Sequence, residues 1–270
     1  MNFWNLMILK DDFILSFIEF CRSIKTIFSL SRLRTIRKMR LIPKEGINDN
    51  LYIILNAPSL KTQDLSVLKG KTLMFVNRGF KHPLYSELSP KYHVFVDSKM
   101  IKGVWPVSWI DEILKMSPQT KILLPLEWAN NPKFKPYNKH IYWLTWKLPF
   151  HNLGVSGACF SFGIQQCFKC IYFTGFDATG IAYEMIQSSD SHFYGNDKEL
   201  EGKKSDQYVI DLLMHSRHLH DLNRLSIYCQ RKNIELINIT NGGLLDMFNR
   251  EQILPILKTV NENHSLHSQH

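Results

Sequence analysis

Polar residues that could bind a nucleotide follow several of the short apolar runs in this chain. The stretch NAPS (56–59) follows one run, NRG (77–79) the next, DS (97–98) a third and GFDATG (175–180) a fourth. Asparagine and serine side chains, with free backbone amides, can hydrogen-bond a base, a ribose and a phosphate, and a helix that begins in such a loop directs its N-terminus at an anion. These residue types are also common in ordinary turns, so one loop alone carries little weight. The candidate ligand-binding residues are Asn56, Ser59, Asn77, Arg78, Asp97, Ser156, Gly175, Asp177 and Thr179.

The apolar runs predict the strands that would position these loops. Several are continuously apolar, which is typical of parallel strands covered by helices on both faces. Helical patterns lie between them, and this order indicates a Rossmann-like, mostly parallel sheet in one α/β domain, residues 46–270. Ligands of such sheets bind beyond the carboxyl ends of the strands. The expected strands are 51–55, 72–76, 92–96, 121–124, 141–144, 171–174 and 234–239, and the expected helices are 109–116, 157–168, 206–232 and 252–260.

The N-terminal segment, residues 1–45, differs in composition from the rest. Residues 1–20 are rich in Phe, Leu, Ile and Trp but are interrupted by charges, so they predict an amphipathic helix and lack the ~18 uninterrupted apolar residues of a spanning helix. Between Cys21 and Lys44 lie eight basic residues and no acidic one, which is most of the net charge of +9. This pattern suits an anionic inner membrane surface, so we expect a cytoplasmic protein held peripherally there. The alternative is that the helix packs on its own domain or on a second subunit of a homo-oligomer.

Sequence motifs for common cofactors and metals are missing. The chain has neither a G-x-G-x-x-G after a strand nor a G-x-x-x-x-G-K-[ST], and it has no D-x-D to collect the oxygen ligands that Mg²⁺ needs. Its five cysteines are odd in number, which indicates a reducing compartment, and Cys167 and Cys170 lack a second pair at zinc spacing, so we assign them to core packing. We expect no cofactor and no metal. Because the positive charge is concentrated in one segment, we also expect no nucleic-acid partner.

Five blocks of the sequence recur in order and spacing in a known family: ILNAPSL, VNRGF, GVSGACFSFGIQQCFKCIYFTGFDATG, SDSHFYG and CQRKNIELINITNGGLLDMF. They resemble blocks of the bacterial sialyltransferases of glycosyltransferase family 42, which modify lipooligosaccharides. The resemblance covers residues 51 to about 250 and omits the basic N-terminal segment. It implies a GT-A-like variant of the Rossmann-like fold and a metal-independent, inverting transfer. The implied donor is a CMP-activated nonulosonic acid, and the implied acceptor is a glycan or glycolipid.

The resemblance also implies roles for individual residues. Asn56 and Asn77 match strand-end asparagines that contact the cytidine monophosphate. Ser156 and Gly157 match a serine-glycine step at the donor, and Gly175 matches a glycine beside the base and ribose.

Other positions depart from the family pattern. Tyr183 matches one of two tyrosines that hydrogen-bond the departing phosphate, whose growing charge such donors stabilise, but the second tyrosine falls at Thr179. Where the family has an arginine before the serine-glycine step, this chain has Leu153, and where the family has its catalytic histidine, this chain has Asn196. These departures make another nonulosonate, or a Kdo sugar, as compatible with the sequence as sialic acid.

His192, in SDSHFYGND, is the first candidate for the catalytic base. A general base must reach the acceptor hydroxyl and titrate near the working pH, which favours histidine. Asp190 or Asp197 could orient or replace it. The alternatives are His215, His218 and His220, which lie in one expected helix. His215 and His218 are three apart and share a face of that helix, whereas His218 and His220 are two apart and do not.

Two further functions remain open at this point. Pterin-type pyrophosphokinases share the N-x-P-S turn and the strand followed by G-x-D, but that activity needs ATP and Mg²⁺, and clustered carboxylates are missing. A degenerate transferase fold kept as a membrane-bound scaffold would account for Asn196. Tryptophans could also form an acceptor platform, although core packing is the expectation for Trp143 and Trp146; the others considered are Trp105, Trp109 and Trp128.

Overall fold

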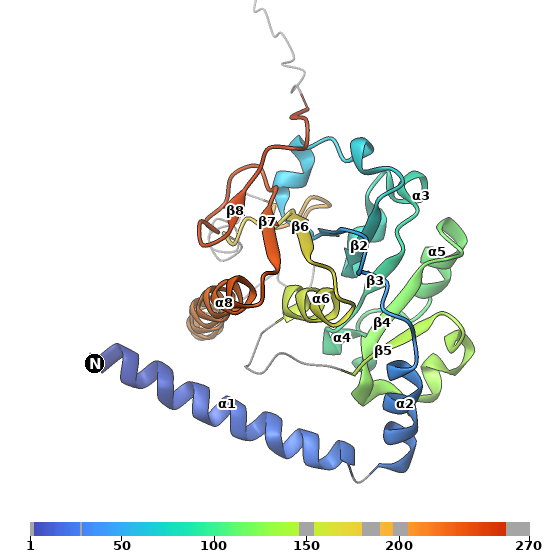
Figure 1. Ribbon diagram of the computed structural model, residues 1–270, viewed down its shortest axis with the longest axis vertical. Coiled ribbons are helices and arrows are strands. Elements are labelled where there is room, and N and C mark those ends of the chain that lie inside the picture. The colour runs from blue at the N-terminus through green and yellow to red at the C-terminus, as the bar shows by residue number, and fades with distance from the viewer. Residues whose placement is uncertain (1–2, 28, 146–153, 180–189, 197–204, 258–270) are drawn as a thin grey trace, which may run out of the picture.

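A single sheet of eight parallel strands forms the centre of the molecule (Figure 1). The computed structural model describes residues 3–27, 29–145, 154–179, 190–196 and 205–257. The α/β, Rossmann-like fold expected from the sequence is therefore confirmed, with every strand pair parallel. The strands are β1 (Leu51–Ile54), β2 (Thr72–Val76), β3 (Tyr92–Val94), β4 (Lys121–Pro125), β5 (Ile141–Leu144), β6 (Cys170–Thr174), β7 (Glu235–Asn238) and β8 (Asn249–Arg250).

The strand order reverses beside β1. From β1 to β5 each new strand is added on one side, and the chain then crosses back to place β6 on the other side of β1, giving the order β5-β4-β3-β2-β1-β6-β7-β8. Ile54 pairs with Phe75 of β2 and with Thr174 of β6, so these three strands end at one level. Such a reversal opens a crevice at the carboxyl ends of the strands, because the connections leave in opposite directions.

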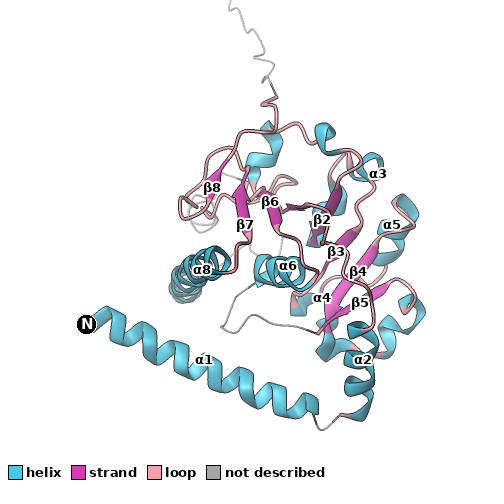
Figure 2. Ribbon diagram, viewed as in Figure 1, coloured by secondary structure: helices cyan, strands magenta, loops and turns pink. Residues whose placement is uncertain are grey.

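Helices cover both faces of the sheet (Figure 2). On β3, Tyr92 contacts Phe162 of α6 (Gly154–Gln165) at 4.8 Å between ring centroids, whereas the next residue, His93, contacts Tyr85 of α3 (Tyr85–Leu88) at 5.7 Å. Successive strand residues point to opposite faces, so α6 and α3 lie on opposite sides. The α-helices are α1 (Phe3–Ile27), α2 (Leu30–Arg40), α3 (Tyr85–Leu88), α4 (Ser98–Lys102), α5 (Trp109–Met116), α6 (Gly154–Gln165) and α8 (Ser205–Arg231).

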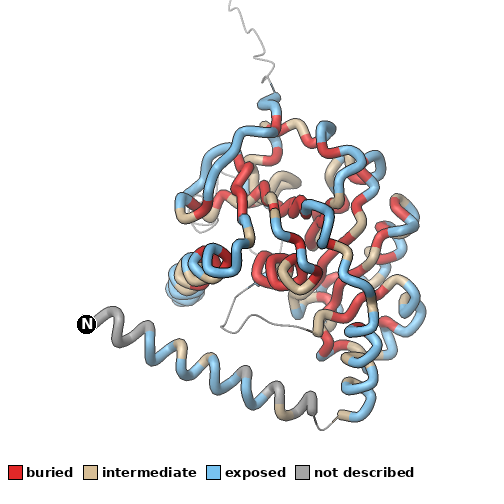
Figure 3. Tube along the Cα trace, in the orientation of Figure 1, coloured by how far each residue is buried: buried red, intermediate tan, exposed pale blue. Residues whose placement is uncertain are grey.

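The central strands lie in the buried core (Figure 3). All four residues of β1 are buried, as are four of the five in β2. Burial on both faces explains why these runs are continuously apolar, since no position in them faces water.

The N-terminal segment forms two helices before the sheet. From α2, Met39 enters the core, and the Arg32 guanidinium donates to the backbone oxygen of Glu127 at 3.2 Å. From α1, the Asp12 carboxylate forms ion pairs with Arg217 and Arg224 of α8. Among the described helices, none has the length and apolar character needed to cross a bilayer.

Two expectations about local structure are wrong. Residues 252–257 of the expected C-terminal helix are extended: Pro255 accepts from the amide of Asp64, and Leu257 donates to the backbone of Thr62. Pairing with this neighbouring segment satisfies the backbone groups that a helix would have satisfied internally. Cys167 is not in the core, because it is exposed at a turn with φ of 66° between α6 and β6.

Candidate functional site

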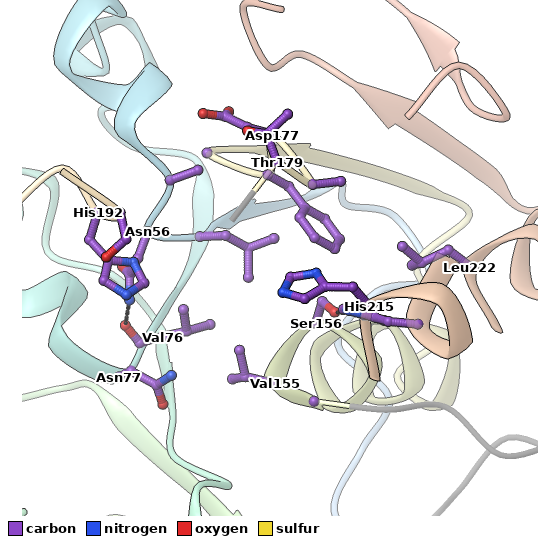
Figure 4. Close-up of a pocket in the computed structure, with 18 of the residues that line it drawn as sticks. Asn56, Val76, Asn77, Val155, Ser156, Asp177, Thr179, His192, His215 and Leu222 are labelled. Atoms are coloured by element: carbon purple, nitrogen blue, oxygen red, sulfur yellow. Dashed lines mark hydrogen bonds between the residues drawn. The ribbon is translucent and has the colours of Figure 1, made fainter. Parts of the chain in front are cut away.

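A cavity of about 730 Å³ lies at the point where the strand order reverses. The loops that follow β1, β2, β3 and β6 form one side of it, and the start of α6 and the middle of α8 form the other. Asn56 and His192 lie across the cavity from Ser156 and His215 (Figure 4). Of the residues proposed from the sequence, those that line it are Asn56, Asn77, Asp97, Ser156, Gly175, Asp177, Thr179 and His192, together with two of the alternative bases, His215 and His218.

Asn56 lies two residues after the end of β1 and is 8% exposed. Its Nδ2 donates to the backbone oxygen of Val76 at 3.2 Å, which fixes the amide plane, whereas its Oδ1 has no partner among the described residues. A buried acceptor without a partner costs free energy, so this oxygen is suited to a donor group of a ligand.

Asn77 has a φ of 47°, in the left-handed region that asparagine tolerates better than most residues. His93, fully buried on β3, fixes this conformation by donating from Nε2 to the Asn77 backbone oxygen at 2.8 Å. Burial lowers the pKa of His93 to about 3, so the ring is neutral and its Nδ1 accepts from the hydroxyl of Tyr85 at 2.9 Å. The Tyr85–His93 pair was missed from the sequence, because a lone histidine inside a strand carries no signal of its partners.

The loop after β6 brings two backbones into close contact. Gly175 has a φ of 64°, and a Cβ there would lie 2.7 Å from the backbone oxygen of Leu55. The amide of Ala57 donates to the Gly175 oxygen at 2.9 Å, which extends the β1–β6 pairing to the cavity. Glycine is therefore required at this position by the backbone of Leu55, the residue that follows β1.

Asp177 is a buried carboxyl at the upper side of the cavity in Figure 4. Its Oδ2 accepts from the amide of Ser59 at 3.2 Å, and its Oδ1 has no partner within the described residues. Burial raises the pKa of Asp177, because removal from water disfavours the charged form. The same lack of a described partner applies to two further hydroxyls of the cavity lining, those of Thr179 and Ser191.

The opposite wall pairs a serine with a histidine. Ser156, in the first turn of α6, is 3% exposed, and its Oγ lies 2.9 Å from Nε2 of His218 on α8. Burial lowers the pKa of His218 to about 4, and the adjacent His215 adds to this. His215 and His218 both line the cavity, whereas His220 faces Asp12 at 3.8 Å, as their spacing predicted.

His192 lies on a short loop attached to β1. The amide of Phe193 donates to the backbone oxygen of Asn56 at 3.0 Å, and the His192 ring stacks on Tyr194 at 4.9 Å. Asn196, which stands at the position of the family histidine, closes this loop by accepting from the amide of Ser191 at 2.7 Å. Asp190 pairs with Lys61 at 2.6 Å.

Several proposed residues do not line the cavity. Ser59 and Gly157 are not among the lining residues, and the guanidinium of Arg78 lies against a group of aromatic rings described below. Asp97 lines the cavity, but its Oδ1 already accepts from the amide of Lys99 at 2.9 Å as the cap of α4. Tyr183, Asp197 and Trp146 lie outside the described residues.

Unpartnered acceptors are the main chemical feature of the cavity. The carboxamide oxygens of Asn56 and Asn77 and the second oxygen of Asp177 have no described partner. Such a set suits a ligand with amino and hydroxyl donors, while the start of α6 can receive an anion through its amides and the hydroxyl of Ser156. Within the described ranges, no group of three or more His, Cys, Asp or Glu side chains is arranged to hold a metal ion.

No family model matches the chain, and neither a search of curated proteins nor a search of solved structures finds a match. The fold and the cavity therefore define the class: a parallel α/β protein of Rossmann-like topology with a polar ligand cavity where the strand order reverses.

Proposed function

We propose that the protein is a metal-independent, inverting glycosyltransferase that moves a sialic-acid-like sugar, a nonulosonate or Kdo, from a CMP donor to a bacterial surface glycan. The observation that carries this proposal is the convergence of Asn56, Asn77, Ser156 and Gly175 on one cavity. These four residues come from separate parts of the chain, and each was matched to the donor site of the family from sequence alone.

The side chains on the two sides of the cavity favour one orientation of a bound nucleotide. The acceptor oxygens of Asn56, Asn77 and Asp177 would take the base amino group and the ribose hydroxyls. The phosphate would lie at the start of α6, where the helix carries roughly +0.5 of a charge, beside Ser156. The glycosidic bond would then lie between this helix and the His192 loop.

His192 is the residue we assign as the base that removes the acceptor proton. His218 is less suited to this role, since its Nε2 is engaged with Ser156 and its pKa is lowered to about 4, well below a neutral working pH. His192 lies across the cavity from Ser156 and is partly exposed, so an acceptor could approach it from solvent.

Nucleotide-dependent stabilisation tests the proposal. The melting temperature of the full chain would be measured with CMP, CDP, UMP and ATP with Mg²⁺, since a ligand at 100 times its Kd adds about 2.7 kcal/mol. CMP is expected to stabilise most. Selective stabilisation by ATP would instead indicate the pyrophosphokinase, and no response to any nucleotide would favour the non-catalytic scaffold.

Asn77→Gly tests the donor site while keeping the backbone conformation. Glycine adopts the φ of 47° without strain, so the change removes only the side chain. We expect CMP affinity to fall about tenfold, the equivalent of one hydrogen bond. The matched control is Asn233→Gly, which replaces an exposed asparagine of φ 53° in the turn before β7. Equal CMP affinity in both variants would remove Asn77 from the site.

His192→Ala should abolish transfer and leave stabilisation by CMP intact. His140→Ala, at the residue before β5 and outside the cavity lining, serves as the control. If His192→Ala still catalysed sugar transfer, another group would be the base, and His215 would be the first residue to test.

We also propose peripheral binding to an anionic membrane. Large apolar side chains of α1 are exposed, among them Phe13 at 74% and Phe17 at 58%, and the first half of α8 exposes Ile210 and Leu213. Exposed cationic side chains lie on α2, the helix that directly follows α1 in the chain. Apolar side chains beside a cationic helix suit an anionic lipid surface, because insertion and charge attraction add.

Vesicle sedimentation tests this assignment. Phe13→Asp with Phe17→Asp should abolish binding to phosphatidylglycerol vesicles, whereas Val67→Asp with Leu244→Asp, which alter exposed apolar residues elsewhere, should not. Wild-type binding to phosphatidylcholine alone should be weak. If the wild type instead forms a dimer that the α1 variant dissociates, the exposed face is an interface between copies of this chain.

A further inference from the structure

A cluster of aromatic rings and cations lies beside the cavity, where β2 and β3 end. Arg78 places its guanidinium 5.3 Å from the ring of Trp109, 5.7 Å from Trp105 and 5.9 Å from Tyr194. The two tryptophan rings lie 5.4 Å apart. Trp105 is buried and forms the base of the cluster, whereas Trp109 and Tyr194 are partly exposed.

Two lysines add charge to this cluster. Lys81 Nζ lies 5.6 Å from the ring of Tyr194, and Lys99 Nζ lies 5.3 Å from the ring of Trp105. In the part of the chain that the structure describes, neither lysine forms an ion pair with an acidic side chain. The nearby carboxylate of Asp97 accepts from the backbone amide of Lys99. Three cations thus share one small surface, which attracts anions.

The cluster is continuous with the loop that carries the proposed base. The ring of His192 stacks on Tyr194, and Tyr194 in turn contacts both Arg78 and Lys81. A molecule on the cluster would therefore lie next to His192 and outside the nucleotide cavity, whose lining excludes Arg78, Lys81 and Lys99. That is where an acceptor must lie for its hydroxyl to reach the base.

We propose that this cluster is the acceptor site and that the acceptor is an anionic saccharide, carrying a phosphate or a carboxylate close to the hydroxyl that reacts. The inference rests on the proposed glycosyltransferase function. The partly exposed rings of Trp109 and Tyr194 provide the apolar contact for a sugar ring. Lys81 and Lys99, next to Arg78, provide the charge-assisted contacts for its anionic group. Arg78, which its sequence position had suggested as a nucleotide-binding residue, is therefore assigned to the acceptor site.

Direct binding tests the acceptor site without requiring transfer. Tryptophan fluorescence of the full chain would be titrated with lactose, with lactose 6′-phosphate and with a disaccharide that contains a uronic acid, each with and without CMP. We expect at least one charged disaccharide to bind about tenfold or more tightly than lactose, as one charge-assisted contact provides. The two charged probes show whether phosphate or carboxylate is preferred, and added salt should weaken either.

A double substitution assigns the effect to the cluster. Lys81→Gln with Lys99→Gln should remove the preference for the charged disaccharide and leave the affinity for lactose unchanged. The matched control is Lys71→Gln with Lys139→Gln, which removes two charges at the opposite, amino-terminal edge of the sheet. Equal binding of charged and neutral disaccharides by the wild type, or an unchanged preference in the cluster variant, would overturn the proposal. If CMP stabilises the protein but charged disaccharides bind no more tightly than lactose, the acceptor assignment alone is wrong and the proposed function stands.

Discussion

The two halves of α8 are both rich in large apolar residues, but their surroundings are opposite. In the C-terminal half Leu222 and Leu225 are fully buried, and His218 reaches the cavity. In the N-terminal half Leu213 is 66% exposed and Ile210 is 60% exposed. The comparison shows that a run of apolar residues predicts an apolar helix surface but not what covers it. The C-terminal half of α8 is part of the core and of the candidate site, whereas the N-terminal half presents an exposed apolar surface.

The largest expected effect comes from a leucine of the buried half. Leu225→Ala should lower the free energy of unfolding by about 2–5 kcal/mol, because it leaves a cavity beneath α8. Urea unfolding followed by circular dichroism measures this change. A loss below about 1 kcal/mol would mean that this half is covered less tightly than its exposure indicates.

The pH dependence of stability should report the buried histidine of the same half. His218 has its pKa lowered by burial from an ordinary 6.5 to about 4. Between these values the unfolded chain binds a proton that the folded chain does not, so stability falls as the pH falls through this range. The contribution of this group is roughly 2 kcal/mol between pH 7.5 and pH 5.

His218→Gln should reduce that slope, while His140→Gln should leave it unchanged. His93, whose pKa is about 3 for the same reason, retains its own share in both variants. Urea midpoints at the two pH values measure the difference. An unaltered slope in His218→Gln would mean that His218 titrates normally.

A smaller effect is expected where α1 meets α8. Asp12 is the α1 residue that pairs with Arg217 and Arg224, and its side chain is only 20% exposed. Asp12→Ala should lower stability by about 1–2 kcal/mol, since it leaves Arg217, 12% exposed, without this partner. The neighbouring Asp11→Ala changes an exposed carboxylate and should have almost no effect. Equal effects of the two substitutions would show that α1 is not held in this way.

The smallest effect on stability should come from the exposed half. Leu213→Ala should change the free energy of unfolding by less than about 0.5 kcal/mol, because its side chain contacts mainly solvent. Ile210→Asp with Leu213→Asp should nevertheless reduce sedimentation with phosphatidylglycerol vesicles. A large loss of stability in Leu213→Ala would show that this half is covered within the protein, and the comparison would no longer hold.

Most of the fold could be predicted from the sequence. Apolar runs located seven strands to within two residues, because parallel strands covered on both faces leave few positions for a polar residue. β8, with only Asn249 and Arg250, both exposed, carried no such pattern. The extended course of residues 252–257 was missed because its partner, at 62–64, is distant in sequence.

The sequence by itself determined the parallel sheet, the polar loops at its carboxyl edge and the basic N-terminal segment, because these depend on local composition and periodicity. Only the tertiary structure decided that Ser156 meets His218, that His93 fixes Asn77, and that Arg78 joins Trp105, Trp109 and Tyr194. Each of these contacts joins residues from different elements. The contacts of His93 and Arg78 with residues of the β2 and β3 region exist because β2 and β3 pair side by side. Tyr194 and the Ser156–His218 pair reach the same edge of the sheet because the strand order reverses beside β1.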